Sequence, residues 1–218
     1  MPVTRILHRA GNIDTRDLDS LRALVRHPAV DAIEADIWLH GDELHAHHER
    51  PLPLPWLIER GSLRRHGEPL RLDAILDAAD GNTEVVIDLR SWLRDAAPAL
   101  ARALADETVR ARVRVTCEDW GLAERVRAWL PDVRIGYSVR SEPQLRAYLA
   151  GRDSGDIVET GVAIRHTLLH TPDEVALLRA RAGHVNAWTV DEVDRALELA
   201  SWGVDAITSN HVTVLNAL

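Results

Sequence analysis

The sequence predicts an α/β protein folded as a (β/α)8 barrel, or TIM barrel. Short apolar runs alternate with segments of helical periodicity along nearly all of the 218 residues, and this strict alternation is typical of a parallel sheet. About eight such units are present, which is the number that closes a barrel. A doubly wound open sheet is the alternative, but its first turn usually reads G-x-G-x-x-G, whereas residues 8–14 read HRAGNID.

Eight segments rich in β-branched and other apolar residues are expected as strands. In chain order they are 4–9, 32–38, 83–89, 112–117, 134–139, 157–164, 184–190 and 205–209. Apolar residues at helical spacing predict helices over 17–27, 71–80, 97–108, 121–130, 141–151, 171–183 and 191–203. Capping residues support the ends of several of them, such as Thr171 at a start and Gly183 and Gly203 at ends.

One segment, residues 49–72, departs from this alternation. It contains four prolines and two glycines, and we expect it to form a loop over the mouth of the barrel that shapes the substrate site. The alternative is an irregular connection without contact to a ligand. No second domain is needed, so we expect a single barrel domain over residues 1–218.

The composition excludes several classes of protein. A net charge of −8 without a basic tract gives no support for nucleic-acid binding. The single cysteine, Cys117, excludes a disulfide scaffold, and we expect it to be a small buried residue. The N-terminus lacks the apolar core of a secretion signal, and no apolar run approaches the roughly 18 residues of a membrane span. We therefore expect a cytoplasmic protein without stable membrane insertion.

Three acidic residues lie on neighbouring predicted strands. Alternation places Glu34, Asp36 and Trp38 on one face of the second strand, and Asp88 and Arg90 on one face of the third. In a barrel these faces point inward, where unpaired carboxylates are costly. Three oxygen ligands at one point suit Mg²⁺ or Ca²⁺, so we predict one divalent cation there. The alternative is an ordinary salt bridge between Asp88 and Arg90, with the other acids capping loops.

Histidines near the same mouth suggest acid–base chemistry. His8 ends the first strand, beside the acids. In ELHAHHER, alternation groups Leu44 and Ala46 with His48, so His48 faces the site if Leu44 and Ala46 look inward; the opposite register would place His47 there. Two imidazoles beside a bound metal can exchange protons with a phosphate ester.

Cationic roles fall to arginine, because the sequence contains no lysine. Arg9 and Arg90 can bind phosphate oxygens through their planar guanidinium groups. In HVNAWTV, alternation puts Trp188 on the same face as Asn186, where it either forms an apolar wall of the substrate pocket or packs in the barrel.

Four motifs in order resemble the glycerophosphodiester phosphodiesterases, whose barrel is of the phospholipase C-like phosphodiesterase type. They are HRAG, IEADIWLHGDELHAHH, VVIDLR and VNAWTVDEVDRALELASWGVDAITSN. The resemblance implies a metal-dependent hydrolase of lipid metabolism that cleaves glycerophosphodiesters to glycerol phosphate and an alcohol. It implies Glu34, Asp36 and Asp88 as metal ligands, His8 and His48 as the acid–base pair, and Arg9 and Trp188 in substrate binding.

Some positions depart from the family pattern. Asp88 and Arg90 stand where the family usually has glutamate and lysine, and Glu49 stands in place of an aspartate. The D-L-R form is similar to the sphingomyelinase D-like phospholipases, which share the barrel and act on lysophospholipids. An inactive barrel that serves as a binding module is a further alternative. The oligomeric state is left open, and the expected partner is a small phosphodiester substrate.

Overall fold

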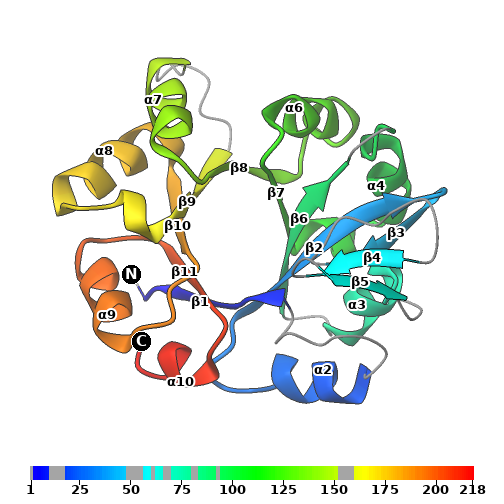
Figure 1. Cartoon of the computed structure of the whole chain (residues 1–218), viewed down its shortest axis with the longest axis horizontal. Coiled ribbons are helices and arrows are strands. Elements are labelled where there is room, and N and C mark those ends of the chain that lie inside the picture. The colour runs from blue at the N-terminus through cyan, green and yellow to red at the C-terminus, as the bar shows by residue number, and fades with distance from the viewer. Residues whose placement is uncertain are drawn as a thin grey trace.

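The computed structural model describes residues 2–9, 18–47, 56–59, 62–65, 70–79, 83–91, 94–151 and 160–218. Eight parallel strands close into a barrel in the order β1, β2, β6, β7, β8, β9, β10 and β11, with β11 returning to β1. Figure 1 shows this ring of strands with the helices outside it. The predicted (β/α)8 barrel is therefore confirmed.

Each of the eight predicted strand segments overlaps an observed barrel strand. These strands are β1 (Thr4–Leu7), β2 (Ala32–His40), β6 (Glu84–Arg90), β7 (Val113–Cys117), β8 (Arg134–Val139), β9 (Thr160–Arg165), β10 (His184–Trp188) and β11 (Ala206–Ser209). The helices are α2 (Leu18–Val25), α3 (Leu72–Ala78), α4 (Ala97–Ala103), α5 (Glu107–Ala111), α6 (Trp120–Trp129), α7 (Glu142–Gly151), α8 (Pro172–Ala182), α9 (Val193–Ser201) and α10 (Val212–Leu215), with a 3₁₀ turn at His166–Leu168. None of the helices that the structure describes could cross a bilayer.

The structure differs from the sequence-based expectation in three places. The predicted helix 97–108 is interrupted, because the Asp106 side chain accepts hydrogen bonds from Thr108 N and Val109 N and starts α5. The helix α10 was not predicted. The predicted loop 49–72 contains an antiparallel hairpin of β4 (Trp56–Glu59) and β5 (Ser62–Arg65), and most of its remaining residues lie outside the described ranges.

The predicted caps of α8 are present. Thr171 accepts a hydrogen bond from Glu174 N, and the Glu174 carboxylate accepts one from Thr171 N, which completes a capping box. Gly183 ends the helix with φ 70°, a left-handed conformation that glycine adopts without strain. These two ends set where the chain enters and leaves the helix between β9 and β10.

The apolar residues separate into an outer and an inner core. On β6, Val85, Ile87 and Leu89 face outward and join the large cluster packed between the strands and the helices. Inside the barrel, residues of four neighbouring strands form a small cluster, which comprises Ile6, Ala32, Val86 and Ala206. This cluster fills only one side of the barrel interior, because it draws on β1, β2, β6 and β11 alone.

Charged residues at the N-terminal ends of the strands close the base of the barrel. The two oxygens of Glu84 pair with Arg114 Nε at 3.2 Å and Arg134 Nη1 at 3.1 Å. Gly161 leaves room for this group, since a Cβ there would lie 3.5 Å from Arg114 Nη1 and 3.3 Å from the His184 carbonyl oxygen. Both oxygens of the Glu84 carboxylate are thus paired with arginine within the protein.

Candidate active site

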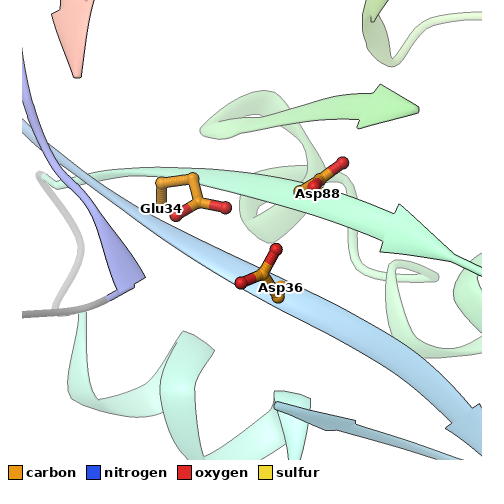
Figure 2. Close-up of side chains that lie close together, drawn as sticks. All are labelled: Glu34, Asp36 and Asp88. Carbon is orange, nitrogen blue, oxygen red and sulfur yellow. The ribbon is translucent and has the colours of Figure 1, made fainter. Parts of the chain in front are cut away.

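Three carboxylates from adjacent strands converge at the C-terminal mouth. Glu34 and Asp36 extend from β2 and Asp88 from β6, where Asp36 and Asp88 are paired directly in the strand register. One oxygen of each lies within 4.8 Å of the others, and Figure 2 shows the side chains directed toward a common space. Glu34 is 7% exposed and Asp36 5% exposed. The structure therefore brings together the three predicted metal ligands.

Burial and mutual repulsion act on these acids. Burial, and then the charge of Asp88, raise the pKa of Glu34 to about 7. Burial, and then the charge of Glu34, also raise the pKa of Asp36, although two arginines oppose this. Burial and the neighbouring carboxylates thus make the ionised forms of Glu34 and Asp36 costly. A cation that binds the triad of carboxylates gains from relieving this repulsion.

Arg90 supplies part of the missing charge. Its Nη2 lies 2.6 Å from Asp36 Oδ1 and 2.7 Å from Asp88 Oδ2, and its Nε donates to Asp88 Oδ2 at 3.0 Å. Burial opposes the charged form, but the charges of Asp88 and Asp36 outweigh it and raise the pKa of Arg90. The salt bridge that was the alternative interpretation of Asp88 is thus present. Asp88 Oδ1 nevertheless has no hydrogen-bond partner among the described residues.

Arg9 holds Glu34 through its backbone. Arg9 N donates to Glu34 Oε2 at 2.8 Å, and Arg9 Nε lies 3.7 Å from Asp36 Oδ2. The residue has φ 51°, a left-handed conformation that costs about 1–2 kcal/mol in a non-glycine residue. The hydrogen bond to a buried carboxylate offsets this cost. Arg9 therefore turns the chain directly at the acids.

His8 connects the acids to a hydrogen-bonded chain on β10 and β11. His8 Nε2 lies 3.7 Å from Glu34 Oε2, and His8 Nδ1 lies 2.8 Å from Asn210 Oδ1. Asn210 donates through Nδ2 to Asp191 Oδ2 at 2.7 Å. Burial alone would raise the pKa of Asp191, but the hydrogen bonds from Asn210 outweigh it and lower this pKa, so the carboxylate is ionised and only accepts.

The hydrogen bonds that join His8, Asn210 and Asp191 fix the tautomer of His8. Because Asn210 Nδ2 must donate to Asp191, Asn210 Oδ1 faces His8 and must accept a hydrogen bond from the Nδ1–H group. Burial lowers the pKa of His8, and the hydrogen bond with Asn210 opposes this only in part, so the neutral imidazole is favoured. Its Nε2 then carries the lone pair next to Glu34.

The pairing of β2 with β3 (Glu43–Ala46) shows which hairpin histidines share the face of the acids. Trp38 is paired with His45, and His47 N donates to the Asp36 carbonyl oxygen at 2.9 Å. Since side chains alternate, His45 and His47 lie on the face of Asp36 and Trp38.

The inward orientation assumed for Leu44 and Ala46 is therefore wrong. Both pack on the outer core, because the outward-facing Ile37 is paired with Ala46. This register favours His47 over His48 as the residue on the acid face. His48 itself lies outside the described residues, so its place stays a prediction.

A cavity of about 160 Å³ opens at the acids and extends across the barrel. Trp188 lines it, as expected for a substrate wall, and the predicted site residues that line it are His8, Arg9, Glu34, Asp36, Asp88 and Arg90. Cys117 instead packs in the outer core, where burial raises the pKa of its thiol.

Sequence reasoning missed several lining or supporting residues. They are Asp191 and Asn210, which hold His8, and Thr116, Glu118, Ser138, Arg140 and Thr208, which line the cavity. Each lies at or near the C-terminal end of a barrel strand. A position at the C-terminal end of a strand, which identified the acids as site candidates, would also have identified these residues.

The chain was compared with known proteins. No family model and no curated protein matches it, whereas solved structures do. A glycerophosphodiester phosphodiesterase from Agrobacterium tumefaciens is 16% identical, covers 100% of both chains and has a TM-score of 0.74. The fold is that of the glycerophosphodiester phosphodiesterases.

Two further solved structures share this fold. The enzyme of this name from Thermotoga maritima is 12% identical over 99% of this chain and 98% of its own, with a TM-score of 0.75. An Oleispira antarctica phosphodiesterase, solved with its product sn-glycerol-3-phosphate, is 17% identical over 100% of this chain and 96% of its own, with a TM-score of 0.72. At these identities the likeness concerns the fold.

Proposed function

We propose that the chain is a metal-dependent phosphodiesterase that cleaves glycerophosphodiesters to glycerol phosphate and an alcohol. One observation carries the proposal: three carboxylates have oxygens within 4.8 Å of one another, and one of them, Glu34, lies 3.7 Å from the imidazole of His8, whose tautomer is defined. The fold shared with a glycerophosphodiester phosphodiesterase, and with a phosphodiesterase that holds its product sn-glycerol-3-phosphate, supports the same function.

The residues present fit a divalent cation. Glu34, Asp36 and Asp88 offer only oxygen donors, which Mg²⁺ and Ca²⁺ prefer. Asp88 Oδ1, which has no partner in the described part of the chain, is an available ligand atom. Bound there, the cation would polarise a phosphoryl oxygen and neutralise the charge that develops on it.

Charge balance in the cavity supports an anionic substrate. Its described lining residues contribute the carboxylates of Glu34, Asp36, Asp88 and Glu118 and the guanidinium groups of Arg9, Arg90 and Arg140. With all of them ionised, one negative charge is in excess. A divalent cation reverses the excess to one positive charge, which a phosphodiester monoanion then neutralises.

The side chains around the acids have distinct roles in the proposed reaction. The contact with Asn210 keeps the proton of His8 on Nδ1, so Nε2 has a free lone pair. This lone pair accepts the proton of the attacking hydroxyl group. A second imidazole, from His47 or His48 on the hairpin, donates a proton to the leaving alkoxide. Arg90 and Arg9 bind the non-bridging phosphoryl oxygens, and Trp188 forms an apolar wall.

Hydrolysis assays test the proposal directly. Purified protein is treated with EDTA, reloaded with Mg²⁺ or Ca²⁺, and offered bis(p-nitrophenyl) phosphate, glycerophosphocholine and lysophosphatidylcholine. We expect metal-dependent turnover, with sn-glycerol-3-phosphate released from glycerophosphocholine. Turnover of lysophosphatidylcholine alone would identify a sphingomyelinase D-like activity instead. Absence of turnover on every phosphodiester, together with absence of metal binding, would indicate an inactive binding module.

A further inference from the structure

Small polar side chains line the cavity on β7, β8, β10 and β11, and the one on β7 is paired with Asp88 in the strand register. They are Thr116 on β7, Ser138 on β8, Asn186 on β10 and Thr208 on β11, here called the polar wall. Their exposed fractions are 4%, 8%, 5% and 2%. Barrel interiors are usually filled by bulky branched residues, whereas among the described residues the small inner cluster contains only Ile6 and Val86 of that kind. The polar wall thus replaces packing with hydrogen-bonding groups.

The hydrogen bonds within the polar wall leave several groups unused. Among the described residues its one side-chain hydrogen bond runs from Thr208 Oγ1 to Asn186 Oδ1, at 3.0 Å. Trp120 Nε1 donates to the backbone oxygen of Ser138, not to its hydroxyl. The hydroxyls of Thr116 and Ser138 and the amide NH₂ of Asn186 therefore face the cavity. Buried polar groups of this kind need water or a ligand as a partner.

Packing holds at least one of these hydroxyls in place. A Cβ at Gly136 would lie 3.0 Å from Thr116 Cγ2, so the glycine makes room for the threonine methyl group. With its methyl group packed against the neighbouring strand, the rotamer of Thr116 is restricted. A hydroxyl held in this way binds a ligand with a smaller loss of side-chain entropy.

The chemistry of the polar wall contrasts with that of the acid side. Two hydroxyls and an amide carry no net charge, whereas the acids on β2 and β6 contact Arg9 and Arg90. A phosphate is therefore attracted to the acid side with its cation, and the polar wall offers donors and acceptors for uncharged hydroxyl groups. An acyl chain placed there would leave all three groups without partners.

We propose that Thr116, Ser138 and Asn186 form a hydroxyl-recognition subsite that binds the polyol part of the substrate and selects against acylated or hydroxyl-free analogues. The placement of the phosphate rests on the proposed function; the recognition of hydroxyl groups rests on the polar wall itself.

A pair of probes that differ only in hydroxyl groups tests the subsite. Binding of sn-glycerol 3-phosphate and of n-propyl phosphate to the whole chain is measured by calorimetry in the presence of Mg²⁺. We expect wild-type protein to bind glycerol phosphate at least about tenfold more tightly. Thr116→Val and Ser138→Ala should each reduce this preference about three- to tenfold, as expected for one neutral hydrogen bond, without changing the affinity for propyl phosphate.

Two further variants complete the design. Thr116→Ser keeps the hydroxyl and should restore the preference. Thr160→Val makes the same change at a threonine that is 3% exposed, lies at the N-terminal end of β9, and has an Oγ1 without a partner in the described ranges; both affinities should stay as in the wild type.

The outcomes separate this inference from the proposed function. Three results would each overturn the subsite, even if phosphodiesters are hydrolysed. They are equal affinities of the wild type for the two probes, an unchanged preference in both Thr116→Val and Ser138→Ala, and failure to bind either probe. A preference that depends on Thr116 and Ser138 would support the subsite, even if no phosphodiester is hydrolysed and the proposed function fails.

Discussion

Replacing Asn210 by alanine should lower kcat by changing the tautomer of His8. Asn210 Oδ1 lies 2.8 Å from His8 Nδ1, and its loss leaves that buried N–H without an acceptor. A buried donor without a partner costs about 1–3 kcal/mol. The other tautomer removes the donor from Nδ1 and carries its proton on Nε2, where the Glu34 carboxylate, 3.7 Å away, favours the positive end of the N–H dipole. That free-energy difference corresponds to about 5- to 150-fold in the tautomer equilibrium.

Because only the tautomer with a free Nε2 can accept a proton from the nucleophile, kcat should fall, by at most this factor, while KM changes little. The tautomer itself is read from the ¹⁵N chemical shifts of His8 in the protein without substrate. Asn216→Ala, the same change at an exposed position after α10, is the control. The reasoning is refuted if Asn210→Ala keeps both the Nδ1–H form of His8 and the kcat of the wild type.

Three other perturbations give distinct results. Asp36→Asn should abolish Mg²⁺ binding in calorimetry, since it removes a ligand charge from the triad, and should leave the far-UV circular dichroism spectrum intact. Retained Mg²⁺ affinity would argue against a metal site there. His47→Ala should reduce turnover by about 10²-fold or more, and His48→Ala by less, because the strand register places His47 on the face of Asp36. A larger loss in His48→Ala would contradict the assignment of His47 to the acid face. Burial, and then the charge of Arg114, lower the pKa of His184 to about 4. The native state then binds fewer protons than the unfolded chain, so the free energy of unfolding should fall by up to about 3 kcal/mol as the pH drops from about 6.5 to 4. Urea unfolding across this range, with His184→Gln as comparison, measures the effect, and an equal slope in the variant would contradict it.

The barrel could be predicted from the sequence because the patterns that indicate its strands and helices are local. Strand alternation at Glu34, Asp36 and Asp88 needs only the period of two residues and the parallel arrangement of neighbouring strands. The same rule explains why the acids meet, since residues at equal depth on β2 and β6 are paired in register.

Features that depend on packing choices were not predicted correctly. The register of the histidines depends on which face of β3 is apolar, and Leu44 with Ala46 fits either side of the strand by composition alone. The contact of Leu44 with the outer core decides it. Likewise, Asp191 and Asn210 are 19 residues apart in the sequence, and only the closure of β10 against β11 brings them together at His8.

The numbers of acidic and basic groups differ between the two ends of the barrel, and this difference fits the proposal that the mouth binds a cation. At the base, the single carboxylate of Glu84 is matched by both Arg114 and Arg134, one at each oxygen. At the mouth, three carboxylates share Arg90 and Arg9. A fold that needed charge only for stability would gain from replacing the buried mouth acids with apolar residues. A bound cation would turn this electrostatic cost into affinity, so the excess of acid at the mouth fits the metal site that we propose there.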